Sequence, residues 1–284
     1  MERAPVPTIG IGYRTQLAPW IELCPGNVEC LEITASDFYK GSQRRILFLG
    51  SKFSLIVRGG GLSLGTPGPL NLSELGWFSS VVAAADPLWI TEPLGFSRTA
   101  EVDLFSSNPV CPNQQTLEIL VDHVLEVMER FRKRVLLENI SSHLRIHGSM
   151  AETELLNSLC DRTGCGILLD VTNLLVNSRN HGFDPRCWIR ELNPETIVQL
   201  RLAGHSSRDG RWEDIVQDSI QDDLWTLVGD VISYAPPTAI TLEWDRHFPI
   251  LQIERELRTL RETALQARMA PTGQILSTGK IART

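Results

Sequence analysis

The sequence has no apolar run long enough to cross a bilayer, and it lacks the excess of basic residues that nucleic acids attract. Its 284 residues include 27 Lys and Arg against 34 Asp and Glu, which gives a formal net charge of −7. Non-specific binding of nucleic acids needs a basic surface instead. Residues 1–13 also lack the long apolar stretch of a signal peptide. We therefore expect a cytoplasmic protein that binds neither nucleic acid nor membrane.

The sequence also lacks the closely spaced cysteine pairs of a structural metal site. None of its cysteines forms a CxxC pair; they are Cys24, Cys30, Cys111, Cys160, Cys165 and Cys187. Structural zinc sites are usually built from tighter pairs, and free cysteines in a reducing compartment pack as small apolar residues. We expect buried thiols and no zinc site.

Short apolar runs alternate with amphipathic stretches along the chain. The runs lie at residues 7–13, 30–35, 53–57, 88–93, 134–139, 166–171, 197–203 and 239–245, and several are continuously apolar, which is typical of strands covered on both faces. Helical patterns lie at residues 115–134, 151–164, 218–235 and 249–268; in the first of these we expect His123 on the polar side. The alternation predicts a single (β/α)₈ TIM barrel over residues 1–268 and a flexible tail over residues 269–284. An open doubly wound sheet is the alternative, but no GxGxxG follows the first run.

Polar residues stand at the end of one apolar run after another. They are Glu32, Arg58, Glu92, Glu138, Asn139, Asp170, Arg201, His205, Glu243 and Asp245. The carboxyl ends of barrel strands meet at one face, where TIM barrels carry their active sites. Converging carboxylates repel one another unless a cation lies between them. That cation could be a metal ion or a guanidinium group.

The recognisable motifs of the sequence are, in order, GIGYR, LEITASDFY, GGGLSLG, TEPLGFS, LLENISSHLR, RTGCGILLDVTNLLVNSRNHGFDP, RLAGH and LEWD. They resemble the signature segments of the MbnB/TglH-like family of multinuclear non-haem iron enzymes, which mature peptide natural products. The resemblance covers about residues 8–265, and residues 163–185 are its most specific part. It implies a TIM barrel, a multinuclear iron centre and oxygen-dependent chemistry beside a cysteine of a peptide substrate. It also implies a partner protein that delivers the peptide.

The sequence departs from the family at positions where the resemblance implies histidine, which are Thr34, Arg58, Pro93, Arg201 and Val216. The family positions that it keeps are Glu92, Glu138, Asp170, Asn173, His181, His205, Asp214 and Glu243. Carboxylates without imidazoles suit magnesium, calcium or manganese better than iron, and an arginine cannot deprotonate to bind a metal. We therefore expect no iron cluster. The cofactor expectation is none, or a single divalent metal held by Glu138, Asp170 and Glu243.

Three functions remain open on this reasoning. The favoured one is a natural-product biosynthetic enzyme that performs metal-independent acid–base chemistry, such as cyclisation, elimination, rearrangement or hydrolysis, with arginine stabilising an oxyanion. The second is a mononuclear divalent-metal or residual iron-dependent enzyme. The third is a non-catalytic protein that binds a ligand or peptide. The expected partners are a small-molecule or peptide natural-product intermediate and the partner protein that the family implies.

The candidate site residues follow from the same reasoning. The expected catalytic residues are Glu138, Asp170, His205, Glu243, Arg201 and Arg58. The expected substrate-binding residues are Glu92, Asn139, Asn173, His181, Asp214 and Trp244.

Overall fold

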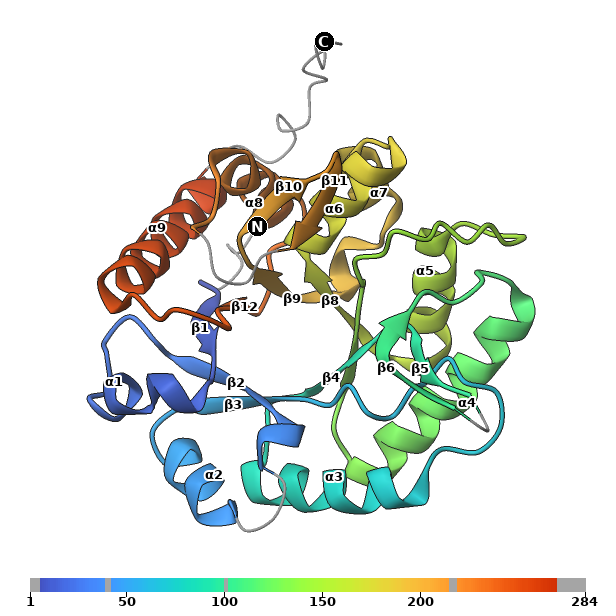
Figure 1. Cartoon of the computed structure of the whole chain (residues 1–284), viewed down its shortest axis with the longest axis horizontal. Helices are drawn as coiled ribbons and strands as arrows, with labels where there is room; N and C mark the ends of the chain where they lie inside the picture. Colours follow the sequence, from blue (N-terminus) through green and yellow to red (C-terminus); the bar gives the residue numbers. More distant parts are fainter. Residues whose placement is uncertain (1–5, 39–41, 100–101, 215–218, 270–284) are drawn as a thin grey trace.

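The computed structural model describes residues 6–38, 42–99, 102–214 and 219–269. Within these residues eight parallel strands close into a barrel, and the helices form a ring around it (Figure 1). In barrel order the strands are β1 (Thr8–Gly12), β12 (Ala239–Leu242), β9 (Ile197–Leu202), β8 (Gly166–Asp170), β7 (Val135–Glu138), β4 (Ile90–Pro93), β3 (Ser54–Arg58) and β2 (Cys30–Thr34). The predicted TIM barrel is confirmed. The predicted tail, apart from Met269, lies outside the described residues.

Helices follow most of the strands. They are α1 (Ala18–Glu22), α2 (Gln43–Gly50), α3 (Leu72–Ala85), α4 (Gln114–Phe131), α5 (Glu152–Thr163), α6 (Val171–His181), α7 (Pro185–Glu191), α8 (Asp222–Tyr234) and α9 (Ile250–Met269), with short 3₁₀ turns at Thr15–Leu17, Ala35–Phe38 and Pro194–Thr196. The four helical patterns of the sequence correspond to α4, α5, α8 and α9. Among the described helices, none is both long and apolar enough to cross a membrane.

Two antiparallel hairpins, which the sequence patterns did not predict, extend from the carboxyl ends of the strands. The first pairs β5 (Phe96–Arg98) with β6 (Asp103–Asn108) after β4, and the second pairs β10 (His205–Arg208) with β11 (Arg211–Asp214) after β9. The second turns through Asp209 and Gly210, which both have positive φ angles. This turn places His205 directly opposite Asp214.

The barrel interior changes from apolar to polar along its axis. A small cluster of buried residues fills part of the interior; it comprises Cys30, Ile56, Trp89, Leu136, Leu168, Val198 and Ala239. Strand side chains alternate between faces with a period of two. The residues two positions after Cys30, Ile56, Leu136 and Leu168 therefore point inward as well, and they are Glu32, Arg58, Glu138 and Asp170. Apolar packing thus forms a floor under a charged cluster at the barrel mouth.

Two expectations about burial were wrong, one for the cysteines and one for His123. The thiols of Cys24 and Cys187 are exposed, so the expectation of buried cysteines is wrong for them. His123 is buried rather than on a polar surface, because the segment after β3 covers this part of α4. Its ring nitrogens lie 2.7 Å from the Leu64 oxygen and 2.8 Å from the Gly68 oxygen.

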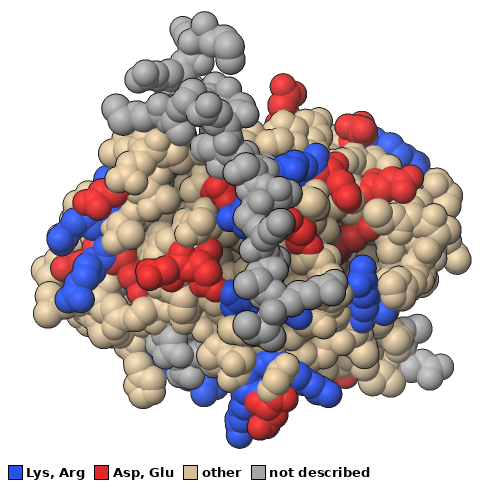
Figure 2. Space-filling model, turned by 90° about the horizontal axis from the view of Figure 1, so that it is seen from above, with Lys and Arg blue, Asp and Glu red and all other residues tan. Residues whose placement is uncertain are grey.

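The outer surface carries both signs of charge. On the face seen in Figure 2, Lys and Arg side chains are interspersed with Asp and Glu side chains, and acidic residues form the larger continuous groups. This distribution agrees with the formal net charge of −7.

Candidate active site at the barrel mouth

Arg201, near the end of β9, lies at the centre of the charged cluster. Its side chain is only 1% exposed. Its Nη1 lies 2.8 Å from Glu32 Oε1, and its Nε lies 3.1 Å from Asp170 Oδ2 and 3.5 Å from Glu243 Oε2. Its Nη2 contacts Glu138 Oε1. One guanidinium group therefore contacts carboxylates that come from β2, β7, β8 and the end of β12.

A second layer of arginines lies above this cluster. Arg58 Nη1 is 3.1 Å from Glu243 Oε1, Arg58 Nη2 is 3.3 Å from Glu138 Oε1, and the Arg58 side chain remains 25% exposed. Arg14 donates from Nη2 to Glu243 Oε1 at 3.2 Å and from Nε to Asp245 Oδ1 at 2.6 Å. The sequence analysis did not single out Arg14. Its signal was its position in GIGYR, directly after the first strand.

Glu32 is held from below by a chain of buried hydrogen bonds. Gln199 donates from Nε2 to Glu32 Oε2 at 2.6 Å and to Thr241 Oγ1 at 3.0 Å. Trp89 in turn donates its indole N–H to Gln199 Oε1 at 2.7 Å. Glu32 therefore belongs to the buried foundation of the cluster and not to its rim.

The carboxyl groups of the cluster have unequal proton affinities. Burial alone would raise the pKa of Glu243, but Arg201, Arg58 and Arg14 outweigh it and lower this pKa to about 2. For Asp170, burial dominates over the attraction of Arg201 and raises the pKa to about 7. Glu243 is therefore a fixed anion near neutral pH, whereas Asp170 can take up a proton there.

Glu92 is a third kind of carboxyl group, because burial keeps it protonated near neutral pH. It is 1% exposed, and burial raises its pKa to about 8 although the Gly60 amide donates to Glu92 Oε1 at 2.9 Å. Gly59 leaves the space that this carboxyl group occupies, since a Cβ there would lie 1.6 Å from Glu92 Oε1. Gly60 has a φ of +93°, a conformation that favours glycine. These two requirements explain the glycines that follow β3.

Asn139 and Asn173 position Asp170. The Asn139 side chain accepts from the Asp170 amide at 2.8 Å and donates to the Asp170 carbonyl at 3.0 Å. Asn173 donates its amide to Asp170 Oδ1 at 2.8 Å and its side chain to the Asn139 carbonyl at 3.0 Å. Both asparagines are buried and fix the direction of the Asp170 carboxylate.

His205 belongs to a separate polar group beside the mouth. Its Nε2 lies 2.8 Å from Arg179 Nη1 and 3.5 Å from Asp223 Oδ2, and its ring is 5.7 Å from that of Trp212. Burial lowers its pKa, so the imidazole is neutral near pH 7. Its contacts therefore join it to α6 and α8 and not to the carboxylates around Arg201.

The remaining predicted residues lie in three different places. His181 contacts the Ser142 carbonyl oxygen through Nε2 at 2.8 Å and lines a cavity beside the mouth. Asp214 is exposed on β11, where it lies opposite His205 and accepts from the Ser141 hydroxyl at 3.4 Å. Trp244 is buried in the main core, with its indole donating to the backbone oxygens of Arg246 and His247. Val216 lies outside the described residues.

The residues at the mouth do not fit a multinuclear iron centre. The space between the carboxylates, where a cation would be attracted, holds the Arg201 guanidinium, and two permanent positive charges repel a further cation. Within the described ranges, no group of three or more His, Cys, Asp or Glu has an arrangement that could hold a metal ion. The cluster is therefore organised around arginine.

The sequence is similar to one family along nearly its whole length. Residues 8–265 match the model of the RiPP precursor modification enzyme family MbnB/TglH/ChrH. A UPF0276 protein of Paraburkholderia phytofirmans (strain DSM 17436 / LMG 22146 / PsJN) is 31% identical over 231 residues, which are 79% of this chain and 73% of the relative. A UPF0276 protein of Anaeromyxobacter sp. (strain Fw109-5) is 31% identical over 218 residues, 75% of this chain and 77% of the relative.

Solved structures with a similar fold are barrel proteins of low sequence identity. A xylose isomerase domain protein from Planctomyces limnophilus superposes with a TM-score of 0.60 at 13% identity, covering 94% of this chain and 100% of the other. D-Psicose 3-epimerase with D-tagatose, from Clostridium cellulolyticum H10, superposes with a TM-score of 0.58 at 15% identity, covering 92% and 96%. At these identities the likeness shows the fold alone.

Proposed function

Because this chain belongs to the MbnB/TglH/ChrH family of RiPP precursor modification enzymes, we propose that it is an enzyme of natural-product maturation that works by acid–base chemistry at the barrel mouth. In this proposal Arg201 supplies the positive charge that a metal supplies elsewhere. The substrate is a small-molecule or peptide intermediate, in keeping with the family's name. The position of Arg201 among four carboxylates is the observation that carries the proposal.

Arg58 is the group best placed to contact a substrate. Arg201 is fully enclosed by its carboxylate partners, whereas a quarter of the Arg58 side chain remains open at the mouth. A guanidinium group that is already held by Glu138 and Glu243 needs little reorganisation to stabilise an oxyanion that develops on the substrate. Arg201 then acts through the carboxylates that it positions.

Glu138 is the candidate general base. Its Oε1 faces both arginines, while its Oε2 is buried and has no hydrogen-bond partner in the described part of the chain. A carboxylate oxygen that no donor engages can accept a proton from a substrate placed against it. Glu92, which is 1% exposed and protonated near neutral pH, adds no second negative charge beside this base. Proton abstraction beside a carbonyl group is the step that these groups support, and it leads to elimination, cyclisation or rearrangement. For hydrolysis, the same base takes a proton from a water molecule that attacks the carbonyl carbon.

The test is co-expression with the peptide precursor encoded nearest to the gene, followed by mass spectrometry of the peptide. We expect a product whose mass is unchanged or differs by one water, formed also without oxygen and in the presence of a chelator. Glu138→Gln should abolish the product, and Glu126→Gln, at an exposed position of α4, should not. Product formation that requires oxygen and iron would contradict the proposal.

A further inference from the structure

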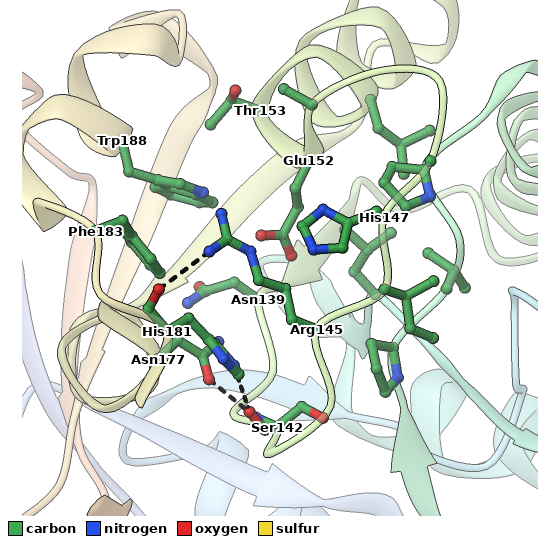
Figure 3. Close-up of a pocket in the computed structure, with 18 of the residues that line it drawn as sticks. Asn139, Ser142, Arg145, His147, Glu152, Thr153, Asn177, His181, Phe183 and Trp188 are labelled. Atoms are coloured by element: carbon green, nitrogen blue, oxygen red, sulfur yellow. Dashed lines mark hydrogen bonds between the residues drawn. The ribbon is translucent and has the colours of Figure 1, made fainter. Parts of the chain in front are cut away.

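A cavity of about 380 Å³ lies beside the barrel mouth, separate from the arginine cluster (Figure 3). It is bounded by residues 139–155, by parts of α6 and α7, and by Leu94 and residues 109–112. Asn139 lines it and also bonds to Asp170, so one end of the cavity lies a single residue away from the cluster. Its volume falls in the range of cavities that bind small molecules, which begins at about 300 Å³.

The wall formed by residues 139–147 is held in place by α6. Asn177 donates to the Ile140 carbonyl at 2.8 Å and accepts from the Ser142 amide at 2.9 Å. His181 contacts the Ser142 carbonyl at 2.8 Å, and Arg145 donates from Nη1 to the His181 carbonyl at 3.0 Å. Because these bonds fix the wall, little ordering is needed when a ligand enters.

The opposite wall is aromatic. Figure 3 shows the rings of Phe183 and Trp188 on one side of the cavity and the ring of His147 on the other, with Arg145 between them. Both aromatic residues are only partly buried, so a part of each is available to a ligand. Aromatic faces favour flat rings, which they contact in offset or edge-to-face arrangements.

The cavity also contains the guanidinium group of Arg145, an exposed residue that forms no ion pair among the described residues. The Arg145 side chain donates a hydrogen bond to the His181 carbonyl. Three carboxylates, those of Glu152, Asp184 and Glu191, line the same cavity and oppose an anion. Asp184 accepts from the Arg186 amide at 2.8 Å and Glu191 accepts from the Thr153 hydroxyl at 2.6 Å, so these two already have partners of their own. Glu152 has the Trp188 indole as its hydrogen-bond partner. A guanidinium group binds carboxylates and phosphates with two parallel hydrogen bonds.

We propose that this cavity binds an aromatic ring that carries an acidic group, either a carboxylate or a phosphate ester. The ring packs on Phe183 and Trp188, and the acidic group binds to Arg145. The proposal goes beyond the reaction described above and does not depend on it, because binding is measured without turnover.

The test is calorimetric titration with phenylacetate, phenyl phosphate and the neutral phenylacetamide. We expect at least one acid to bind, and the amide to bind at least about tenfold more weakly, since it lacks the charge that Arg145 recognises. The tighter of the two acids identifies the acidic group. If neither acid binds at roughly 10 mM, where a fragment of this size should be detected, the proposal is wrong.

Variants distinguish binding in this cavity from a non-specific effect of the protein's net charge on anion binding. Arg145→Gln should weaken acid binding at least about tenfold, and Trp188→Leu should weaken both acids and the amide. Arg258→Gln, at an exposed position of α9 on another part of the ring, is the matched control and should bind as the wild type does. Unchanged binding in Arg145→Gln, with an unaltered melting temperature, would overturn the assignment.

Discussion

Arg201 and Arg58 carry the same group, yet they differ in what surrounds them. Arg201 is 1% exposed and contacts four carboxylates, whereas Arg58 is 25% exposed and contacts two. Removing a buried partner leaves charges without compensation, while a partly exposed partner is replaced by water at lower cost. At the residue scale, therefore, the proposal gives Arg201 a positioning role and makes Arg58 the arginine that contacts the substrate.

The raised pKa of Glu92 can be tested by measuring how the stability of the protein depends on pH. Its folded-state pKa of about 8 lies above its usual value of 4.5, so the folded state holds the proton more tightly than the unfolded state does. The stability of the wild type should consequently fall as pH rises from 4.5 to about 8. Glu92→Gln lacks this group, so its advantage over the wild type should grow with pH, by at most about 5 kcal/mol.

Urea denaturation between about pH 5 and pH 9 measures this difference. Glu126→Gln, on the exposed face of α4, is the control and should follow the wild-type curve. Parallel curves for Glu92→Gln and the wild type would mean that Glu92 is ionised in the folded protein at neutral pH.

At the element scale, Asp170 joins the charged cluster to a helix. It is the last residue of β8 and the N-cap of α6, where its Oδ1 accepts from the Asn173 amide at 2.8 Å while its Oδ2 faces Arg201. A single carboxylate thus ends a strand, begins a helix and contributes charge to the site. The following helix then carries Asn177 and His181 to the wall of the lateral cavity.

Two substitutions at Asp170 separate its roles. Asp170→Asn keeps an oxygen that can cap α6, whereas Asp170→Ala removes the cap and the charge together. We expect the alanine variant to be less stable than the asparagine variant by about 1 kcal/mol, the usual value of an N-cap. Asn113→Ala removes the N-cap of α4, away from the cluster, and should cost a similar amount in urea denaturation. Equal stability of both Asp170 variants would show that the cap contributes nothing here.

At the scale of the whole molecule, Arg201 connects strands that are far apart in the sequence. Its partners lie 169 positions away at Glu32 and 31 positions away at Asp170. The barrel brings them together because parallel closure places β2, β7, β8, β9 and β12 around one axis. The ion pairs of Arg201 therefore help to hold the carboxyl ends of these strands in fixed positions relative to one another.

Replacing this charge tests whether it stands in the place of a metal ion. Arg201→Ala should lose about 3–5 kcal/mol of stability, because four carboxylates, three of them buried, lose their common partner. Added Mn²⁺ should restore part of this loss by binding between them, but it should leave the melting temperature of the wild type unchanged. Arg201→Lys keeps the charge and should be insensitive to Mn²⁺. Arg162→Ala, which breaks an exposed ion pair with Glu118, is the control.

Stabilisation of the wild type by Mn²⁺ or Fe²⁺ would contradict this reading of Arg201. So would an Arg201→Ala variant that is as stable as the wild type. Both results come from melting curves measured with and without the metal ion, so they require no knowledge of the substrate.

The sequence by itself determined the barrel, the family and the face of the barrel where the charged cluster lies. Apolar runs alternating with helical patterns indicate parallel strands covered on both sides. Polar residues at the ends of most of these runs mark the mouth, because all the strands point in the same direction. Both are properties of neighbouring residues, so they can be read locally. The motifs from GIGYR to LEWD likewise lie within short segments.

Only the tertiary structure decided which polar residues are buried, which are exposed and which contact one another. Arg201 and Arg58 look alike in sequence, but one is enclosed by carboxylates from other strands and the other reaches the mouth. His205 closely follows an apolar run in the sequence, as Asp170 closes one, yet in the structure it begins β10 and contacts Arg179 and Asp223. Trp244 packs in the core, and the cavity around Arg145 is formed by segments that no local pattern connects. Burial and pairing depend on contacts between residues distant in the chain, so they exist only once the barrel has closed.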